Sequence, residues 1–423
     1  MLTRRDFLQV TAATAAMFGP AGGIAAAAAA QKISQEELLK FDSVGQVTLL
    51  NFTDIHAQLV PLYFREPSVN LGVGAVNGLP PHLTGKDFLK RFDIAAGTRD
   101  AYAFSSQDFS ALAQQYGRIG GLAQMATLIK AIRAERPGNT LLVDTGDTWQ
   151  GSYTSLETKG EDMVDAMNAL GVDLMTAHWE FTYGAERVQE LIEKLNFPFL
   201  AGNVRDTEFD EPVFESTKFF ERGGVNIAMI GQAFPYTPIA NPRYMIPEWS
   251  FGIQEDIVRG HVEAARAAGA DLVVLASHNG FDVDRKLASR VDGIDVILTG
   301  HTHDAIPGVI KVGDTLLIAT GSHGKFLGRL DLDVQNRKIK NYSYKLIPIF
   351  SDAITPDPEI DAVVKSIRAP HAKVLDEVLA KTESTLYRRG NFNGTFDDLI
   401  CQAIIQERDT EIALSPGFRW GRS

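Results

Sequence analysis

Residues 46–56 read QVTLLNFTDIH, and this stretch decides the fold. Its first eight residues are rich in Val, Leu, Thr and Phe, as in a buried strand, and Asp54 and His56 follow them. A carboxylate and an imidazole that follow a strand directly can bind a divalent metal ion. The stretch therefore predicts a sheet whose strand ends carry metal ligands.

The same arrangement returns along the chain, because several apolar runs end on a polar residue that can bind metal. Helical periodicity fills the intervals between these runs, which predicts a layered α/β fold with helices outside buried strands. In such folds ligands bind beyond the carboxyl ends of the strands. The predicted strands and the residues that follow them are 139–143 with Asp144 and Asp147, 172–176 with His178, 198–201 with Asn203, 271–276 with His278, and 293–299 with His301 and His303; the predicted helices are 119–134, 161–170, 186–195 and 255–268.

Together these residues indicate a two-metal hydrolase. A single histidine at a strand end is usually a surface or hydrogen-bonded residue, but five of the nine histidines follow strand-like runs here. Two divalent ions need carboxylates and imidazoles that converge from several strands, with one carboxylate able to bridge both ions. The chain supplies this set in order.

Composition and charge narrow the class of protein further. The chain has 423 residues, of which 45% are hydrophobic and 22% charged, as in an ordinary globular protein. Its formal net charge of −12 disfavours nucleic acid as a partner, for which a basic face is expected. Cys401 is the only cysteine, so no disulfide can form within the chain.

The N-terminus reads TRRDFL over residues 3–8 and continues as an Ala-rich apolar stretch to residue 30. This pattern is typical of a twin-arginine export signal, and it predicts a signal peptide over 1–30, cleavage within 25–30 and a periplasmic mature protein. The alternatives are a membrane anchor or a disordered tail. Gly19 and Pro20 interrupt the stretch and its side chains are small, so we expect no stable membrane anchor.

Three other segments carry weaker signals. Residues 61–110 are rich in Gly and Pro and predict a long surface insertion outside the core. Residues 311–346 predict consecutive antiparallel strands that complete a second sheet. A helix predicted over 359–381 suggests a linker to a second domain. We therefore divide the chain into a catalytic domain over 45–350, a linker helix within 351–385 and an incomplete C-terminal domain over 386–423.

The motifs as a set resemble those of the 5′-nucleotidase branch of the calcineurin-like metallophosphoesterases. The resemblance implies a layered β-sandwich flanked by helices, followed here by the start of a truncated substrate domain. It also implies that Asp147 bridges two metal ions, the first with Asp54, His56 and His303, and the second with His178, His278 and His301. The matching motifs are Asp54-Ile-His56, Gly146-Asp147-Thr-Trp-Gln-Gly151, Gly202-Asn203, Ser277-His278 and Gly300-His-Thr-His303.

One motif departs from that of the nucleotidases, which read G-N-H-E-F-D and use the Asn as a ligand and the next His in catalysis. Here the segment reads Ala177-His178-Trp179-Glu180, so an imidazole takes the ligand position and an indole replaces the catalytic imidazole. This run and the late Ser415-Pro-Gly-Phe-Arg-Trp-Gly421 resemble the SoxB thiosulfohydrolases. That resemblance implies release of sulfate from a cysteine-bound S-thiosulfonate on the SoxYZ carrier protein, with two divalent ions, most readily Mn²⁺.

Four further residues have open roles. Arg419 lies in the SoxB-like C-terminal match and is the candidate for binding a substrate anion, with a solvated arginine as the alternative. Trp179 and Tyr183 are candidates to line the catalytic site or to pack in the core. Asn203 is a candidate for substrate binding or for shaping a loop. The alternative functions are a periplasmic nucleotidase or related phosphoesterase, and a metal-bearing binding module without catalysis.

Overall fold

The computed structural model describes most of the chain. The described residues are 33–63, 65, 72–388 and 394–415. The predicted signal peptide and Arg419 lie outside these residues, so both remain predictions. Among the described residues, no helix is both long enough and apolar enough to cross a bilayer.

The first sheet is formed around the strand that precedes Asp54. β1 pairs parallel with β2 and antiparallel with β12, and β2 continues parallel to β3. The carboxyl ends of β1, β2 and β3 therefore lie at the same edge. In spatial order the strands are β13 (Lys338–Pro348), β12 (Phe326–Gln335), β1 (Val47–Phe52), β2 (Thr140–Asp144) and β3 (Leu174–Met175).

The second sheet has a parallel centre and two antiparallel edges. β6, β8, β9 and β11 run parallel, while β5 and β10 pair antiparallel at the two sides. A short third sheet pairs β4 (Arg205–Asp206) with β7 (Trp249–Ser250). The strands of the second sheet are, in order, β10 (Ile310–Val312), β11 (Thr315–Ala319), β9 (Val296–Thr299), β8 (Leu272–Ser277), β6 (Val225–Gln232) and β5 (Thr217–Arg222).

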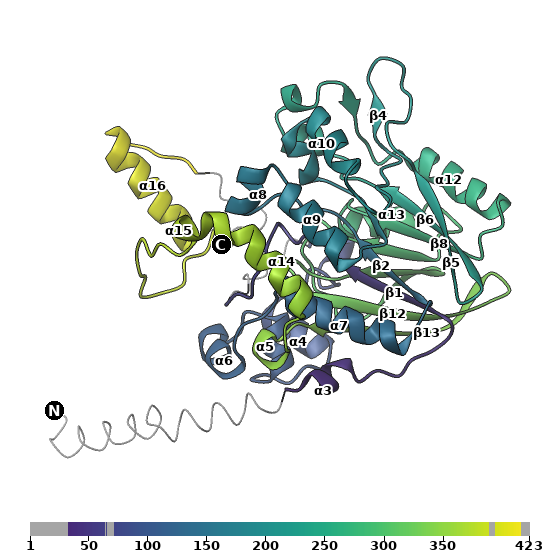
Figure 1. The fold of residues 1–423 in the computed structure, drawn as a ribbon, viewed down its shortest axis with the longest axis horizontal. Coiled ribbons are helices and arrows are strands. Elements are labelled where there is room, and N and C mark those ends of the chain that lie inside the picture. The colour runs from purple at the N-terminus through teal and green to yellow at the C-terminus, as the bar shows by residue number, and fades with distance from the viewer. Residues whose placement is uncertain (1–32, 64, 66–71, 389–393, 416–423) are drawn as a thin grey trace.

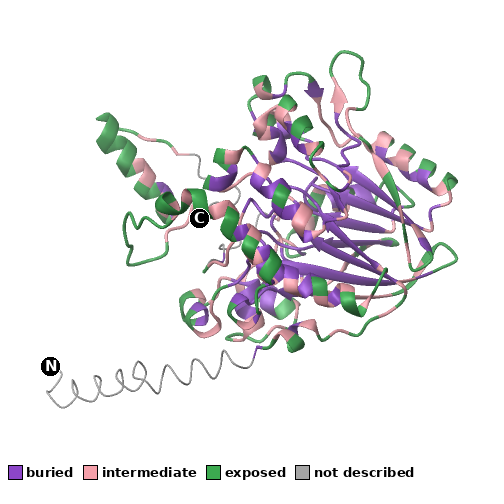
Figure 2. Cartoon of the chain, viewed as in Figure 1, coloured by how far each residue is buried: buried purple, intermediate pink, exposed green. Residues whose placement is uncertain are grey.

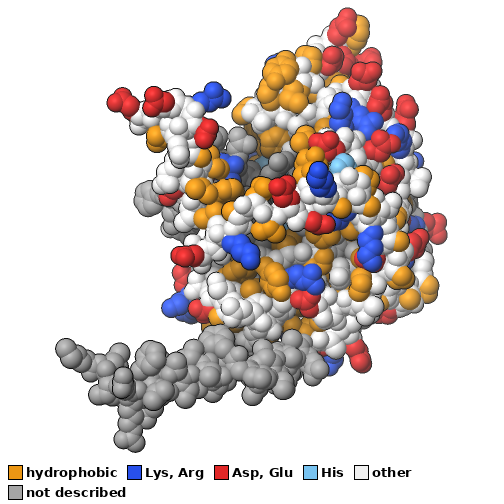
Figure 3. Space-filling model, turned by 60° about the vertical axis from the view of Figure 1, so that its left-hand side comes forward, with side chains coloured by type: hydrophobic (Ala, Val, Ile, Leu, Met, Phe, Trp, Pro, Cys, Tyr) orange, Lys and Arg blue, Asp and Glu red, His pale blue; other side chains and the backbone are white. Residues whose placement is uncertain are grey.

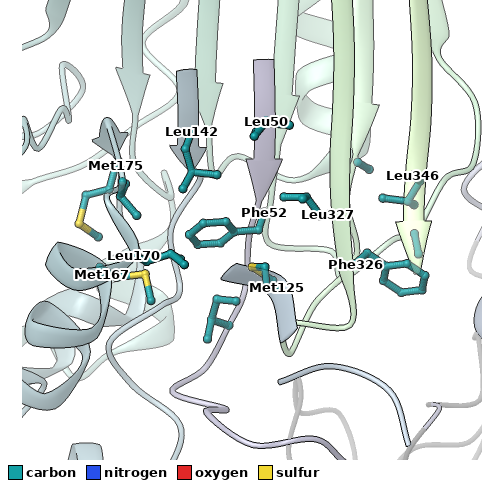
Figure 4. Packing of buried hydrophobic residues seen from close by; sticks show 14 of the residues in the cluster. Leu50, Phe52, Met125, Leu142, Met167, Leu170, Met175, Phe326, Leu327 and Leu346 are labelled. Atoms are coloured by element: carbon teal, nitrogen blue, oxygen red, sulfur yellow. The ribbon is translucent and has the colours of Figure 1, made fainter. Parts of the chain in front are cut away.

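Successive side chains along β1 point to opposite faces of the sheet and contribute to two separate apolar layers. Val47 and Leu49 of β1 join a buried cluster with residues of the second sheet, such as Met229, so this cluster fills the space between the sheets. Leu50 and Phe52 point to the opposite face, where they join the cluster beneath the helices (Figure 4). Because successive side chains of a strand point to opposite faces, both faces of β1 are buried, as expected for a strand between two layers.

The helices cover the outer faces of both sheets (Figure 1). α7, α9 and α14 lie together over the first sheet, and α12 and α13 lie over the second. The helices are α3 (Gln35–Leu39), α4 (Gly85–Arg91), α5 (Arg99–Phe104), α6 (Phe109–Tyr116), α7 (Leu122–Glu135), α8 (Tyr153–Thr158), α9 (Glu161–Leu170), α10 (Ala185–Ile192), α11 (Thr237–Ala240), α12 (Glu255–Ala267), α13 (Phe281–Ala288), α14 (Pro358–Arg368), α15 (Ala372–Leu375) and α16 (Thr395–Arg408). The predicted α/β architecture is confirmed.

Local signals explain where these helices begin and end. α9 starts with Glu161 and Asp162, which suit the positive end of the helix dipole, and it ends at Gly171 in the left-handed conformation. α14 starts at Pro358, and the Asp357 side chain accepts a hydrogen bond from the backbone N–H of Ile360. These are the start and stop patterns that the sequence carries at the predicted helices.

The prediction of a surface insertion over residues 61–110 is wrong. The segment contains α4, α5 and the start of α6, and it buries Phe88, Tyr102 and Phe104 within the same cluster as the helices of the first sheet. Tyr102 also stacks on Phe350 with ring centroids 6.5 Å apart. The helices span only six to eight residues, which is too short for helical periodicity to be clear in the sequence.

The prediction for residues 311–346 is wrong in part. β10 and β11 do extend the second sheet, but β12 and β13 return to the first sheet, where Leu49 of β1 is opposite Leu330 of β12. β12 is buried along nearly its whole length because it lies between β1 and β13 and contributes side chains to both apolar clusters. The strand patterns are consecutive in sequence, and pattern alone does not assign consecutive strands to one sheet or to two.

The predicted linker helix is also shorter than expected. α14 ends at Arg368, a 3₁₀ turn follows over Ala369–His371, and α15 covers one further turn. Pro370 cannot donate the backbone hydrogen bond that a continuous helix needs there. Figure 2 shows α16 extending away from the buried sheets with a largely exposed surface.

Candidate metal centre

Seven side chains converge at the carboxyl ends of five strands. Asp54 and His56 follow β1, Asp147 follows β2, and His178 follows β3. His278 directly follows β8, and the loop after β9 supplies the remaining two. The strand order brings these five ends together from both sheets, as the positions in the sequence predict. The full set is Asp54, His56, Asp147, His178, His278, His301 and His303.

The ligand atoms form two groups. Asp54, His56 and His303 form a three-residue cluster, and Asp147, His178, His278 and His301 form a four-residue cluster, with the atoms of each cluster within 4.8 Å of one another. Two ligands about 2.1 Å from one ion lie roughly 3–4 Å apart. The distances of 3.3 Å from Asp54 Oδ1 to His303 Nε2 and 3.1 Å from Asp147 Oδ2 to His278 Nε2 suit that arrangement.

Asp147 links the two clusters. Its Oδ2 lies 3.1 Å from His178 Nδ1 in its own cluster and 3.7 Å from His56 Nε2 in the other. Its Oδ1 accepts a hydrogen bond of 2.7 Å from the backbone N–H of Trp179. One carboxylate oxygen therefore faces ligand atoms of both groups, which is the position that a bridging ligand requires.

The proton positions on two imidazoles fit a cation at each cluster. His278 Nδ1 lies 2.5 Å from the carbonyl oxygen of Thr145, and His56 Nδ1 lies 3.1 Å from that of Gln150. A carbonyl only accepts hydrogen bonds, so Nδ1 carries the proton and a neutral ring turns its Nε2 lone pair toward the cluster. Asp54 Oδ1 is buried and makes no hydrogen bond to any described residue. The Nε2 lone pairs of these rings and the nearby carboxylate oxygens repel each other unless a cation lies between them.

The pKa values of Asp54 and His278 reflect their opposite charges, whereas burial lowers the pKa of His56, His178 and His301. Burial alone would raise the pKa of Asp54, but His303 and His278 lower it to about 2. Burial opposes protonation of His278, but Asp147 and Asp54 raise the pKa of His278 to about 10. Without metal, a proton on His278 compensates the two carboxylates, and a divalent ion can take the place of that proton.

The turns that carry the ligands have an unusual backbone conformation. Asp54, His56, Asp147, His301 and His303 all have positive φ angles, between 51° and 79°. Non-glycine residues rarely adopt this left-handed region, and such residues cluster at functional sites, where the surrounding structure holds them in place. Five of the seven cluster residues therefore occupy tight turns that aim their side chains inward.

Glu180 ties together two of the ligand loops. It is fully buried, and its Oε1 accepts hydrogen bonds from the backbone N–H groups of Thr148 and Trp149 at 2.6 and 3.1 Å. Its Oε2 accepts from the N–H groups of His178 and Asp147 at 2.7 and 3.3 Å. The sequence pattern did not single out Glu180, although its place two residues after His178 is a usable signal.

Two aromatic rings border the four-residue cluster. Phe234 stacks on His301 with centroids 3.9 Å apart, and its ring lies 4.1 Å from that of His178. The half-buried Trp179 lies on another side of His178, with centroids 4.7 Å apart. These rings pack against the imidazoles of His178 and His301 and restrict their orientation.

Comparison with solved structures identifies the family. The fold superposes on the sulfate thiohydrolase SoxB of Thermus thermophilus with a TM-score of 0.85 and 37% identity, covering 88% of this chain and 69% of that one. The chain belongs to the SoxB family, within the 5′-nucleotidase branch of the calcineurin-like phosphoesterases. Its fold is that of the metallophosphoesterases, and its two clusters form a candidate dimetal site.

Two other proteins that resemble this chain are 5′-nucleotidases. A 5′-nucleotidase precursor from Thermus thermophilus shares the fold, with a TM-score of 0.67 and 20% identity over 86% of this chain and 67% of that one. The bovine 5′-nucleotidase is 25% identical over 335 residues, which cover 71% of this chain and 57% of that protein. The chain spans between half and two thirds of the length of these curated relatives. No family model matches the chain.

Within this SoxB-family fold, Asn203 supports a loop. Its side-chain amide donates hydrogen bonds to the carbonyl oxygens of Ala233 and Gly252 at 2.8 and 2.9 Å, and its carbonyl accepts from Ala233 N–H at 2.8 Å. The side chain is fully buried, and all three of these hydrogen bonds are to backbone groups. The structure favours the loop-shaping role over substrate binding, and Asn203 acts by fixing the residue before Phe234.

Tyr183 likewise makes contacts that support the structure. Its hydroxyl lies 3.0 Å from the carbonyl oxygen of Ser155 and 3.2 Å from that of Trp149. These contacts join the end of the 3₁₀ turn Trp179–Tyr183 to α8 and to the loop after β2. A catalytic role for Tyr183 stays a prediction, as does the role of Arg419 in anion binding.

Proposed function

We propose that this protein releases sulfate from a cysteine-bound S-thiosulfonate on a SoxYZ-type carrier during thiosulfate oxidation. The observation that carries the proposal is Trp179, which lies directly beside His178 where nucleotidases of this branch keep a catalytic histidine. The 37% identity to a sulfate thiohydrolase supports it. The chain covers 69% of the length of that protein, so the activity of the full-length protein is part of this proposal.

The chemistry of the leaving group explains why an indole is tolerated. In the proposed reaction the oxygen of water joins the sulfonate sulfur, the sulfur–sulfur bond breaks, and the electron pair leaves on the carrier's sulfur. Both protons of the water are released to solvent as sulfate forms. An ordinary thiol has a pKa of about 8.5 and leaves with little help from an acid, whereas a sugar alkoxide is far more basic. The indole of Trp179 cannot exchange a proton near neutral pH, so it suits the first leaving group and not the second.

The metal centre supplies the remaining chemistry in this proposal. Two divalent ions, which we propose are Mn²⁺, would activate water and neutralise charge on the sulfonate. Asp147 would be shared between them, Glu180 would hold the loops of Asp147 and His178, and Phe234 would keep His301 in place. Oxygen and nitrogen ligands of this kind also accept zinc or iron, so the identity of the metal rests on the family resemblance.

The decisive experiment compares two products from one preparation. The protein is loaded with Mn²⁺ and incubated separately with a thiosulfonated carrier and with AMP, and sulfate and phosphate are measured. The proposal requires efficient sulfate release and little phosphate release. Faster hydrolysis of AMP than of any thiosulfonated carrier would replace it with the phosphoesterase alternative.

A periplasmic nucleotidase is the second candidate. The observation in its favour is that the metal clusters and the curated relatives both belong to the 5′-nucleotidase branch. The absence of an imidazole at position 179 argues against it. A binding module without catalysis is the third candidate, and the absence of both products in the experiment above would favour it.

We also propose export to the periplasm by the twin-arginine route, without a stable membrane anchor or a nucleic-acid partner. The support is the pair Arg4 and Arg5 before an Ala-rich apolar stretch, together with the net charge of −12. On the face shown in Figure 3, acidic and basic side chains are interspersed.

Replacing Arg4 and Arg5 with Lys should hold the precursor in the cytoplasm. Normal periplasmic accumulation of that variant would contradict the proposal.

A further inference from the structure

A buried carboxylate outside both metal clusters lies behind two of their ligands. Asp284 belongs to α13, the helix that follows β8, and its side chain is fully buried. It is in neither group of possible metal ligands found among the described residues. A buried carboxylate is costly unless hydrogen bonds compensate it, so its partners show which segments it holds.

Asp284 accepts three side-chain hydrogen bonds from the ends of two neighbouring strands. Its Oδ1 accepts from Ser277 Oγ at 2.8 Å and from Asn279 Nδ2 at 2.9 Å. Its Oδ2 accepts from Thr299 Oγ1. Ser277 is the last residue of β8, and Thr299 is the last residue of β9. One carboxylate therefore joins the carboxyl ends of both strands.

The three donors lie beside two ligands of the four-residue cluster. Two of the donors flank His278 in sequence, and the third is two residues before His301. The backbone adds a link between the same strand ends, because the N–H of Gly300 donates to the carbonyl oxygen of Ser277 at 2.9 Å. The ring centroids of the two imidazoles are 5.4 Å apart, and this spacing depends on the strand ends that Asp284 joins.

Glu180 has the corresponding place behind the other two ligands of this cluster. It accepts hydrogen bonds from the backbone N–H groups of Asp147 and His178, in the loops after β2 and β3. Asp284 serves the loops after β8 and β9 in the second sheet, through hydroxyl and amide groups of side chains. The four ligands are thus held as two pairs, with one buried carboxylate for each sheet.

We propose that Asp284 is a positioning residue of the metal centre, which fixes the spacing of His278 and His301 by joining the carboxyl ends of β8 and β9. The inference rests on the proposed function only in requiring the dimetal centre, which a sulfohydrolase and a nucleotidase of this branch would share. Binding of metal at the four-residue cluster should therefore depend on Asp284 more than binding at the three-residue cluster.

The test measures metal binding separately from turnover. Metal-free wild type and Asp284→Ala are titrated with Mn²⁺ by calorimetry, and the loaded proteins are examined by electron paramagnetic resonance. Loss of a partner that orients ligands should lower the affinity for one ion by roughly 10–100-fold. At the Mn²⁺ concentration that gives the wild type the spectrum of a coupled pair, Asp284→Ala should give the signal of isolated Mn²⁺.

Asp295→Ala is the matched control, because Asp295 joins the same two strands at their opposite ends. Asp295 directly precedes β9, and its Oδ2 accepts a hydrogen bond of 2.7 Å from the N–H of Val273 in β8. Both substitutions should lower the unfolding temperature, but only Asp284→Ala should weaken Mn²⁺ binding. Wild-type affinity and a coupled-pair spectrum in Asp284→Ala would overturn the inference, and so would an equal loss of affinity in Asp295→Ala.

Two milder variants apply the same test if Asp284→Ala does not fold. Asp284→Asn keeps a carbonyl oxygen that can accept from Ser277 and Asn279, so it should bind Mn²⁺ more tightly than any variant without an acceptor there. Thr299→Val keeps the carboxylate and removes only the donor at the end of β9, so it should weaken binding of one ion and leave the other unchanged. Wild-type affinity for both ions in Thr299→Val would overturn the inference, because the strand ends would then keep their spacing without this link.

The same data distinguish this inference from the proposed function. If the protein hydrolyses AMP but not the thiosulfonated carrier, the function proposed above is wrong. The inference on Asp284 then still stands if its substitution weakens Mn²⁺ binding and that of Asp295 does not. If sulfate is released efficiently but Asp284→Ala binds both ions as the wild type does, the function stands and the inference on Asp284 is overturned.

Discussion

The two sides of the metal centre have different surroundings. The three-residue cluster is bordered by polar groups: Thr53 donates to Asp54 Oδ2 at 2.7 Å, His301 N–H donates to the same oxygen at 3.0 Å, and His323 lies close by. The four-residue cluster is bordered by the aromatic rings of Phe234 and Trp179. The difference predicts different responses to substitution, with charge and hydrogen bonds dominant on the first side and ring packing on the second.

Replacing the residue that faces both sides should have the largest effect. Asp147→Ala removes the carboxylate oxygen that lies 3.1 Å from His278 Nε2 and 3.7 Å from His56 Nε2. Losing several kcal/mol of charge stabilisation should lower turnover by about 10³-fold or more. Metal analysis should show that both ions are bound more weakly, and chelation of the wild type should abolish its activity. Full activity of a metal-free preparation would refute a dimetal mechanism.

Glu180→Gln should disturb mainly the aromatic side. The amide group would place a donor against backbone N–H groups that now meet carboxylate oxygens at 2.6 to 3.3 Å. Removing a partner that orients ligands costs roughly 10–100-fold in metal affinity. Thermal unfolding should also show lower stability, by roughly 1–3 kcal/mol for the lost buried hydrogen bonds.

The matched control for this substitution is Glu186→Gln, at an exposed glutamate in the first turn of α10. It should leave metal affinity unchanged and lower stability less than Glu180→Gln does, because a first-turn carboxylate contributes about 0.3–1 kcal/mol through the helix dipole. If titration of the Glu180→Gln protein shows two ions bound with wild-type affinity, the loops are held by other contacts and the comparison of the two sides loses its basis.

The residues after the strand ends were predictable from the sequence for a physical reason. Buried parallel strands read as apolar runs, and their carboxyl ends meet at one edge, so sequence pattern alone groups Asp54, Asp147 and His278. The two clusters confirm that grouping. The ends of helices with clear capping signals, such as Gly171 after α9, were equally readable.

Other features depend on contacts between distant segments. Phe234 follows β6, a buried strand that the sequence pattern did not predict, and its stacking on His301 depends on how loops from different strands meet. His323 follows a strand as the ligands do, but a lone histidine beside glycine carries little signal. Tyr102 and Phe104 are buried where they stack on Phe350 and on Phe326 of β12, both more than 200 residues further along the chain. Sequence pattern does not report such long-range packing.

Trp179→His tests the aromatic side more gently. The backbone N–H of residue 179 holds Asp147 Oδ1, and a histidine keeps that N–H, so both metals should remain bound. An imidazole can protonate an oxygen leaving group, so phosphate release from AMP should rise by about tenfold or more. Sulfate release should not need the change. Trp179→Phe is the control, because it keeps an aromatic ring without a titratable group, and an equal rise in that variant would contradict the explanation.

The smallest expected effect is a pH dependence of the metal-free protein. His278 has a folded pKa of about 10, above its ordinary 6.5, so its contribution to stability is complete below pH 6.5 and is lost as the pH rises through 10. Asp54 has a folded pKa of about 2, below 3.8, so its contribution is complete above pH 3.8 and is lost as the pH falls through 2. These two groups together favour the metal-free fold most between pH 3.8 and 6.5.

Calorimetry of the metal-free protein should therefore show a midpoint that falls by a few degrees, roughly, from pH 6.5 to pH 9. In the metal-loaded protein the ion replaces the proton on His278, so the midpoint should stay nearly constant over the same range. His278→Gln is the control, because it removes the titrating ring from the four-residue cluster. If the slope of the metal-free protein survives in His278→Gln, another group causes it, and the surplus negative charge inferred for this side of the centre is wrong.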